Sequence, residues 1–489
     1  MCRPRTGRRG DATDGTVSAV EGSQARGTPL ERAALEHSAA LRARLSEVLG
    51  EPLTGEMRRL SGGASRETHQ LACASRGDMI LQSEHAGKPS GEPPGQAALL
   101  WAAEQAGVPV AAVIAHGADD PVLGAAWTLV EALPGTTDPA EIFASLPAGD
   151  PPELLDGVAH ALAAVHRMPV DASLAPEVAD PVAQLRALHD SLGEPHPTFE
   201  LAFRALGADR PPQRRALVHG DFRIGNLMVD GDRVSGVLDW ELAHIGDPAE
   251  DLGWLCVPAW RFGRPQLPAA GLGTREQLLA AYERHSGQAV TMAELRRWEL
   301  LGTLRWGVIC VMQSFTHLSG ASRSIGRAVI GRRACEVEWD LLGLLGGQGE
   351  GAAGRGAVRA DAPPEPPRLH DSPSAVELLE AARGALGEHV LPLLDGRPAF
   401  ELRVTLRALG IVRRELEHGR EHAATHAAAL AMLGVTDEAE LADAIRGGAF
   451  ENRDAELHAA LRAIVSAKLQ VANPGYLQTH ENDPGRERD

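Results

Sequence analysis

Two short apolar runs separated by an Asp-Gly turn give the clearest structural pattern in the chain. Leu227 to Val229 and Val234 to Leu238 flank Asp230-Gly231, and Asp-Gly between two such runs predicts a β-hairpin. If the chain folds back around this turn, position 226 lies opposite roughly position 236. Residues just before the first strand and just after the second are therefore expected to meet at the open end of the hairpin.

Helical periodicity dominates most of the remaining chain. Apolar stripes predict a helix that begins near Pro29, a helix over residues 154–166, and a long, mostly apolar and therefore buried helix over residues 291–318. Ser374 to Glu377 has the pattern of a capping box at the start of an all-helical region. The helices expected in that region end near residue 394 and then cover 399–418, 421–433 and 438–470.

Polar, aperiodic segments divide the chain into units. Residues 1–28 and 476–489 are predicted to be disordered tails, and the Gly-, Ala- and Pro-rich stretch 346–370 is predicted to be a linker. This linker separates a domain at 31–345 from a helical bundle at 371–475. No catalytic pattern is visible in the bundle, so docking or self-association is its simplest role.

Three side chains suited to phosphoryl transfer surround the predicted hairpin. Asp221 lies in the preceding loop His219-Gly220-Asp221, Asn226 stands before the first strand, and Asp239 follows the second. Phosphoryl transfer needs one carboxylate to orient the attacking hydroxyl, with an Asn and a second Asp to hold Mg²⁺ on the nucleotide phosphates. The spacing therefore predicts a catalytic site.

A calcium loop is a competing interpretation of the same segment. Asp230, Asp232 and Glu241 fall at loop positions one, three and twelve. However, Val234 and Ser235 stand where such a loop needs a ligand and a turn glycine. A loop of merely solvated acids is also possible, but it leaves the coincidence of these polar residues unexplained.

The segment resembles the catalytic loop and metal strand of the aminoglycoside phosphotransferase-like kinases, a branch of the protein-kinase-like fold. The resemblance implies that Asp221 is the catalytic base and that His219 supports the loop. It further implies that Asn226 and Asp239 are the Mg²⁺ ligands.

The same resemblance implies an α+β fold: a bilobal protein-kinase-like domain followed by a separate all-α helical bundle. The N-lobe would cover 31–131, the hinge 132–136 and the C-lobe 137–345. The run Gly246 to Trp254 also matches the family. Within it, Asp247 and Asp251 are interpreted as structural groups that brace the following helix.

Four further polar positions are less decisive. His166 is interpreted as a packed or capping histidine. The long apolar helix is interrupted by Arg305, Gln313 and His317. Two interpretations stay open for these side chains: they line the acceptor pocket, or they are polar groups tethered within the core.

The N-lobe sequence resembles the family in its nucleotide loop. Leu60 to Thr68 contains a Ser-Gly-Gly-Ala-Ser stretch like that of the acyl-CoA-dehydrogenase-associated branch. The resemblance places Gly62, Gly63 and Ser65 at the nucleotide phosphates, where backbone N–H groups bind anions. By position in the fold, the hinge backbone from Glu131 to Leu133 is expected to bind the adenine.

The N-lobe also departs from the family pattern. Gln82 stands where family members have a Lys or Arg that contacts the phosphates, and Gln96 stands where the Glu partner of that cation is expected. A neutral hydrogen bond is weaker than the charge-assisted one, which contributes about 1.5–3 kcal/mol. Lys88, six residues past Gln82, is a candidate to replace the lost charge, although a Lys in such a Gly- and Pro-rich stretch is more often simply solvated.

Together these features predict an ATP- and Mg²⁺-dependent phosphotransferase that acts on a small-molecule hydroxyl. For the acyl-CoA-dehydrogenase-associated branch, the expected acceptor is a hydroxyacyl-CoA, and an aminoglycoside or other antibiotic is the second acceptor class. A pseudokinase-type binding protein with a weakened nucleotide site is a third hypothesis. The C-terminal bundle resembles an uncharacterised helical domain found after such kinases in bacteria.

Bulk composition agrees with a large soluble enzyme. The formal net charge of −18 argues against nucleic acid as the main partner. No apolar run approaches the roughly 20 residues of a membrane span, and the Arg-rich N-terminus lacks the apolar core of a signal peptide. The five cysteines are scattered, which predicts free thiols and a cytoplasmic location.

Overall fold

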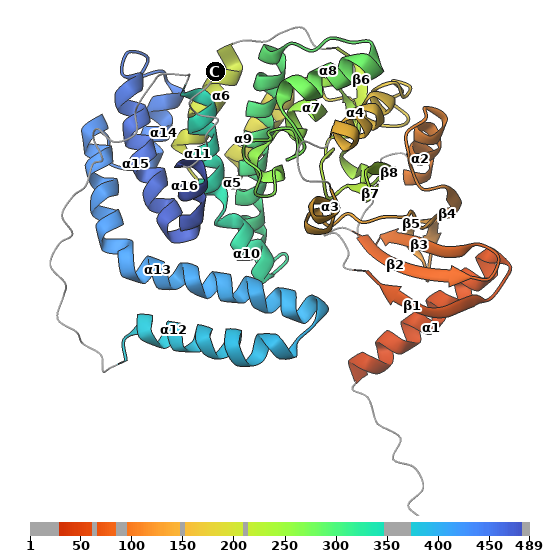
Figure 1. The fold of residues 1–489 in the computed structure, drawn as a ribbon. Coiled ribbons are helices and arrows are strands. Elements are labelled where there is room, and N and C mark those ends of the chain that lie inside the picture. The colour runs from red at the N-terminus through yellow and green to blue at the C-terminus, as the bar shows by residue number, and fades with distance from the viewer. Residues whose placement is uncertain are drawn as a thin grey trace, which may run out of the picture.

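A computed structural model describes residues 29–60, 66–84, 95–146, 152–208, 214–346 and 373–481. The predicted fold class is confirmed: an antiparallel sheet lobe precedes a helical lobe, and long helices follow at the C-terminus (Figure 1). Within the described ranges, no helix combines the length and the apolar character needed to cross a membrane.

The N-lobe is a five-stranded antiparallel sheet in the order β1-β2-β3-β5-β4. Alternating side chains of β3 are buried, as expected for a sheet with one covered face, and helix α1 contributes Leu41 and Leu45 to the same core. The elements are α1 (Pro29–Leu49), β1 (Leu53–Arg59), β2 (Arg66–Cys73), β3 (Gly77–Glu84), α2 (Gln96–Gln105), β4 (Val113–Asp120) and β5 (Gly124–Glu131).

The segment after β5 is attached directly to the catalytic hairpin of the C-lobe. Thr136 exchanges two backbone hydrogen bonds with Val229, at 2.9 and 3.0 Å, and Ser235 Oγ donates to the carbonyl of Pro134 at 2.6 Å. These bonds fix the path of the chain between the lobes relative to the hairpin.

Helices form most of the C-lobe, and α9 runs through its centre with eleven buried residues. The predicted long helix at 291–318 is therefore confirmed as buried. The elements are α3 (Pro139–Ser145), α4 (Pro152–His166), α5 (Pro181–Leu192), α6 (Pro197–Ala208), β6 (Ala216–Val218), β7 (Leu227–Asp230), β8 (Arg233–Val237), η1 (Trp240–Leu242), β9 (His244–Gly246), α7 (Ala249–Leu255), η2 (Pro258–Trp260), α8 (Arg275–Ser286), α9 (Met292–Leu318), α10 (Ile325–Gly331) and α11 (Ala334–Leu345).

The predicted hairpin is present, but its register differs from the prediction by two residues. The Leu238 N–H donates to the Asn226 carbonyl at 2.8 Å, so Asn226 faces residue 238 rather than 236. The turn is centred between residues 231 and 232 rather than on residue 231, which accounts for one residue of the register difference. An irregularity between Met228 and Val229 leaves Ser235 as an extra residue in β8 and accounts for the other.

The C-terminal region is helical, with two differences from the predicted boundaries. The helices expected at 399–418 and 421–433 are one continuous helix, because Gly419 does not interrupt it, whereas residues 447–453 divide the helix expected at 438–470. The capping box at Ser374 is confirmed. The elements are α12 (Ala375–Ala385), η3 (Leu386–Val390), η4 (Leu391–Leu393), α13 (Gly396–Leu433), α14 (Glu438–Arg446), α15 (Asp454–Ala472) and α16 (Pro474–Glu481).

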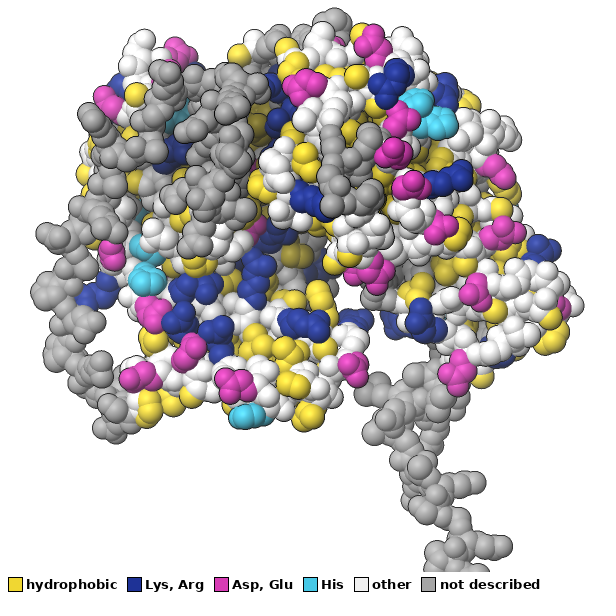
Figure 2. All heavy atoms as spheres, in the orientation of Figure 1, with side chains coloured by type: hydrophobic (Ala, Val, Ile, Leu, Met, Phe, Trp, Pro, Cys, Tyr) yellow, Lys and Arg dark blue, Asp and Glu magenta, His cyan; other side chains and the backbone are white. Residues whose placement is uncertain are grey.

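The C-terminal helices share a hydrophobic core with the C-lobe. Cys335 and Leu342 of α11 belong to the same buried cluster as residues of α13, α14 and α15. Ion pairs join the same regions: Arg332, after α10, bonds Glu415 at 2.7 Å, and Arg407 lies 3.4 Å from Glu336. Figure 2 shows Lys and Arg side chains gathered along α13.

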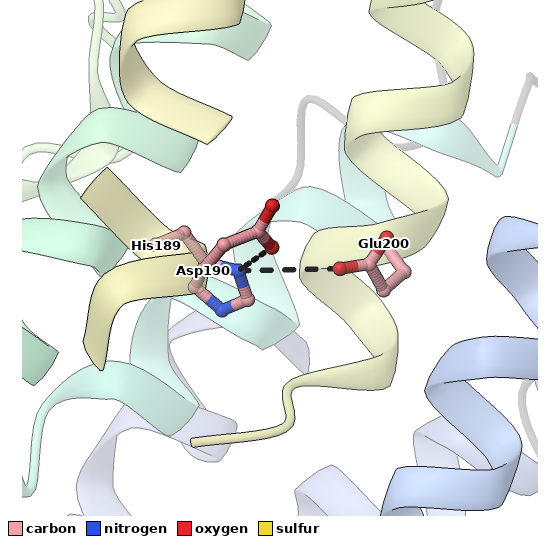
Figure 3. Close-up of side chains that lie close together, drawn as sticks. All are labelled: His189, Asp190 and Glu200. Carbon is pink, nitrogen blue, oxygen red and sulfur yellow. Dashed lines mark ion pairs between the residues drawn. The ribbon is translucent and has the colours of Figure 1, made fainter. Parts of the chain in front are cut away.

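His189, Asp190 and Glu200 form a cluster at this junction whose ligand atoms lie within 4.8 Å of one another (Figure 3). Both oxygens of the buried Glu200 already accept hydrogen bonds at 2.6 Å from Arg186, and Arg446 of α14 bonds the same carboxylate at 2.8 and 3.2 Å. Two guanidinium groups therefore neutralise the acids and oppose a bound cation. The cluster attaches α14 to α6.

Candidate active site

The catalytic loop begins where β6 ends and turns sharply at Gly220. This residue has φ +78°, and a Cβ at its position would lie 2.3 Å from the carbonyl oxygen of Leu242. Only glycine fits a left-handed backbone in such close contact. Sterics therefore require the glycine in the middle of the His-Gly-Asp pattern.

Asp251 of α7 holds the backbone of this loop. Its two carboxylate oxygens accept the N–H groups of His219 at 2.7 Å and Gly220 at 2.9 Å, and His166 Nε2 lies 3.2 Å away. Burial alone would raise the pKa of Asp251, but the hydrogen bond from His166 and the other donors outweigh burial and lower that pKa. Asp251 and His166 therefore have the bracing and packing roles expected of them.

His219 connects the loop to the open end of the hairpin. Its Nδ1 accepts the Asp221 N–H at 3.2 Å, so Nε2 carries the proton and donates to the Leu238 carbonyl at 2.9 Å. Burial lowers the pKa of His219, which favours the neutral ring. Both ring nitrogens are thus bonded to backbone groups, in a position that supports the loop.

The carboxylate of Asp221 has three side-chain donors. Oδ1 accepts from Trp254 Nε1 at 2.8 Å and from Arg223 Nε at 3.0 Å, and Oδ2 accepts from Asn226 Nδ2 at 2.6 Å. The Asn226 nitrogen also donates to the Asp221 carbonyl. The structure thus brings Asp221 and Asn226, which are five residues apart in sequence, into direct contact.

Asp239 lies at the end of the same hairpin. It directly follows Leu238, whose backbone bonds both His219 and Asn226. Asp239 is exposed and has the left-handed backbone angles φ 62° and ψ 66°. Asp tolerates this region better than most residues, and such backbone conformations are concentrated at functional sites.

Beside Asp221 lies an aromatic wall that consists of the rings of Trp254, Trp260 and Trp306 and that the sequence did not predict. The ring centroids of Trp254 and Trp260 are 5.4 Å apart, and those of Trp260 and Trp306 are 5.0 Å apart. The Arg223 guanidinium stacks over Trp260 at 4.6 Å, and that of Arg305 over Trp254 at 5.0 Å. Asp251 and Trp254 are three residues apart and so share one helical face, which is the sequence signal that could have placed Trp254 beside the loop.

Arg305, Gln313 and His317 are tethered by neighbouring groups. Arg305 pairs with Glu250 at 3.1 Å, Gln313 bonds Arg327, and His317 accepts the Ser324 N–H at 3.1 Å. Of the three, Arg305 also contacts the aromatic wall, through its stacking on Trp254.

In the N-lobe, Gln82 and Gln96 meet as a hydrogen-bonded pair. Gln96, the first residue of α2, donates through Nε2 to the Oε1 of Gln82 on β3. The two residues therefore occupy paired positions, as the family pattern led us to expect, but neither carries a charge. Gly62, Gly63, Ser65 and Lys88 lie outside the described residues.

The hinge residues proposed for adenine follow directly on the sheet. Glu131 ends β5, with an exposed side chain and an N–H that donates to the Ala112 carbonyl at 3.0 Å. Leu133 packs against the C-lobe core, next to Gly236 of the hairpin. Its side chain belongs to the partly buried apolar group that includes Ile80 and Val113.

Comparison with known families identifies two matched segments. Residues 56–290 match the family described as the phosphotransferase enzyme family. The chain carries a domain of this family. Residues 392–476 match a domain of unknown function (DUF6285), in agreement with the resemblance of the C-terminal helices.

A curated relative is acyl-CoA dehydrogenase family member 10 of Mus musculus, 30% identical over 246 residues. The match covers 45% of this chain but only 22% of the mouse protein. It places the phosphotransferase domain near the acyl-CoA-dehydrogenase-associated branch that the Ser-Gly-Gly-Ala-Ser stretch indicated.

Solved structures include a candidate aminoglycoside phosphotransferase from Ralstonia eutropha, with 22% identity, a TM-score of 0.49, and coverage of 62% of this chain and 97% of that one. Another is a thermostable mutant of aminoglycoside phosphotransferase APH(4)-Ia in a ternary complex with AMP-PNP and hygromycin B. This structure is 18% identical, has a TM-score of 0.44, and the match covers 65% of this chain and 99% of that one. At these values, neither structure identifies a substrate for this chain.

Replacing Asp251 with Asn is expected to loosen the catalytic loop. Asn has one accepting oxygen, so at least one buried N–H loses its partner at a cost of about 1–3 kcal/mol. Because the folded pKa of Asp251 is lowered, its contribution is present above the unfolded value of about 3.9 and is lost as pH falls below it. Urea unfolding and amide exchange of Gly220 measure both effects.

The matched control is Asp232→Asn, which changes an exposed acid in the hairpin turn. It should alter stability by less than about 0.5 kcal/mol. Between about pH 5 and 8, the stability gap between the wild type and Asp251→Asn should stay constant. A variant at position 251 as stable as the wild type would show that Asp251 does not hold the loop.

Proposed function

We propose that the phosphotransferase domain transfers the γ-phosphoryl group of ATP to a hydroxyl of a small molecule. The acceptor oxygen attacks the γ-phosphorus, the bond from that phosphorus to the ADP oxygen breaks, and Asp221 takes the hydroxyl proton. The observation that carries this proposal is the contact of Asp221 with Asn226 beside the strand end that bears Asp239. This set has the parts that phosphoryl transfer requires.

The donor chemistry fits Mg²⁺ at Asn226 and Asp239. Asn226 uses its amide nitrogen on Asp221, so its oxygen is the end suited to a cation, and Asp239 adds a carboxylate. Hard oxygen donors of this type are the ligands that Mg²⁺ prefers. When bound, Mg²⁺ would neutralise charge on the nucleotide phosphates, while the protein groups position the phosphates and the acceptor.

We favour an anionic acceptor with an apolar part, such as a hydroxyacyl-CoA, over a polycationic aminoglycoside. Arg223 and Arg305 lie on the tryptophan wall beside Asp221, and Glu250 already pairs with Arg305 and with His244. The tryptophan rings suit the apolar part of an acceptor, and a guanidinium paired with one carboxylate retains N–H donors for an anion. The similarity to an acyl-CoA dehydrogenase family member supports the same acceptor class.

A pseudokinase-type binding protein is the second candidate function. The neutral Gln82–Gln96 pair favours it, because the phosphates lose a cation in the N-lobe. The complete set of Asp221, Asn226 and Asp239 opposes it, since a protein without catalysis has no chemical need for all three.

The docking or self-association role of the C-terminal helices stays a prediction. Helix α12 buries none of its residues and packs on α13. Leu378, Leu393 and Phe400 of this helical hairpin are 56%, 80% and 60% exposed. Exposed apolar side chains of this size on neighbouring elements are typical of contact surfaces.

Calorimetric titration of ATP tests the metal site. We expect saturable binding that requires Mg²⁺, and a weakening by about 10- to 100-fold in Asp239→Ala, because a charged contact of about 1.5–3 kcal/mol is lost. Asp239→Asn separates loss of the charge from backbone strain, since Asn also tolerates the left-handed region.

Asp232→Ala, at the exposed turn of the same hairpin, is the control and should bind as the wild type does. Equal magnesium-dependent binding by Asp239→Ala and the wild type would remove Asp239 from the metal site. If the wild-type protein bound no nucleotide at millimolar concentration, the pseudokinase hypothesis would replace the kinase.

Restoring the family's ion pair is expected to strengthen nucleotide binding. Gln82→Lys combined with Gln96→Glu should tighten ATP binding about tenfold, because a charge-assisted contact replaces a neutral one. Gln105→Lys adds the same charge at the exposed far end of α2 and should leave affinity unchanged. An unchanged affinity in the double variant would mean that position 82 does not contact the phosphates.

A coupled assay of ADP release separates the acceptor classes. We expect turnover with hydroxyacyl-CoAs but neither with the matching acyl-CoAs that lack the hydroxyl nor with hygromycin B or kanamycin. Asp221→Asn should lower kcat by about 10²- to 10⁴-fold, the usual effect of losing a general base. Mass spectrometry of the acceptor identifies the phosphorylated product. Turnover with the aminoglycosides alone would favour a resistance enzyme.

A further inference from the structure

The two carboxylate oxygens of Asp221 differ in their hydrogen bonding. Oδ1 accepts from both Trp254 Nε1 and Arg223 Nε, and an oxygen of a carboxylate has about two accepting positions. Among the described residues, the side-chain donor to Oδ2 is Asn226 alone. Oδ1 is thus saturated, whereas Oδ2 retains one accepting position.

Trp254 is held where its indole N–H meets Oδ1. It is 3% exposed and lies one helical turn after Asp251, which binds the loop backbone. Residues three apart share a helical face, so α7 presents both side chains to the loop. The helix packs so closely on α9 that a Cβ on Gly253 would lie 2.4 Å from the carbonyl carbon of Trp298.

We propose that Trp254 is a positioning residue for Asp221: its N–H fixes the carboxylate through Oδ1, so that Oδ2 faces the acceptor hydroxyl. This inference rests on the proposed phosphotransferase function. In the transfer step, the hydroxyl proton moves to Oδ2 as the new oxygen–phosphorus bond forms and the bond to ADP breaks. Trp254 itself exchanges no proton.

The role is separable from simple packing because Trp127, in the N-lobe sheet and outside the aromatic wall, provides a matched control. Trp127 is 8% exposed, and its Nε1 has no hydrogen-bond partner among the described residues. Phe at either position retains an aromatic ring and removes the N–H. Only Trp254→Phe removes a hydrogen bond to Asp221.

The first test measures the contact itself and does not depend on activity. The full chain, which has 8 tryptophans, is labelled with ¹⁵N at the indole nitrogens, and the signal absent from Trp254→Phe is assigned to Trp254. We expect this signal to be shifted and slow to exchange with solvent, and to move and exchange faster in Asp221→Ala. The Trp127 signal, from the N-lobe sheet, should stay unchanged. An unmoved Trp254 signal would overturn the inference.

The second test measures turnover with the acceptor identified by ADP release. Trp254→Phe should lower kcat by about 10- to 100-fold and leave the affinity for Mg-ATP unchanged, whereas Trp127→Phe should stay within about twofold of the wild type. In the Asp221→Asn background, Trp254→Phe should add less than about a twofold loss.

The two tests separate the failure of this inference from that of the proposed function. Wild-type kcat in Trp254→Phe, or equal losses in both Phe variants, would overturn the positioning role while leaving a working kinase. Absence of turnover in the wild type would end the proposed function. In that case the indole signal alone would decide whether Trp254 holds Asp221.

Discussion

The buried carboxylate of Asp251 is the constraint on which the geometry of the site depends. It accepts hydrogen bonds from two backbone N–H groups of a loop that must turn at Gly220, and His166 stabilises its negative charge. A buried carboxylate is costly unless its oxygens are fully bonded, and the same bonds define where the loop lies. Asp221 can then face the hairpin only because Asp251 has fixed the residues before it.

The two lobes contribute unequally to the proposed nucleotide site. The C-lobe has the carboxylates of Asp221 and Asp239 and the amide of Asn226, whereas the N-lobe position expected to carry a cation has the neutral pair of Gln82 and Gln96. Under the proposed function, the metal would then supply most of the positive charge at the phosphates. This arrangement predicts a site whose nucleotide affinity depends on Mg²⁺ more strongly than in relatives with the ion pair.

The sequence was sufficient to predict the hairpin and the meeting of Gln82 with Gln96, while the catalytic and metal roles of Asp221, Asn226 and Asp239 stay predictions. These features depend on local turn chemistry or on spacing within a known motif. The predicted hairpin register was wrong because no sequence signal marks Ser235 as an extra residue in β8. The Trp254 donor to Oδ1 was missed because Trp254 reaches Asp221 only through the packing of α7 on α9, which is a tertiary effect. The continuous α13 was missed because a mid-helix glycine costs only about 1 kcal/mol, which packing readily offsets.

The shared core changes how the C-terminal helices relate to the site. Helix α15 packs on α11 and α14 on α6, and both α11 and α6 pack on α9, which also supports α7. Helix α7, which carries Asp251 and Trp254, therefore rests on the same helix, α9, as the two C-lobe helices on which the C-terminal helices pack. Native interiors leave little free volume, so these helices form one continuous packed body rather than independent layers. The position of the catalytic loop and the packing of the C-terminal helices consequently depend on the same central helix.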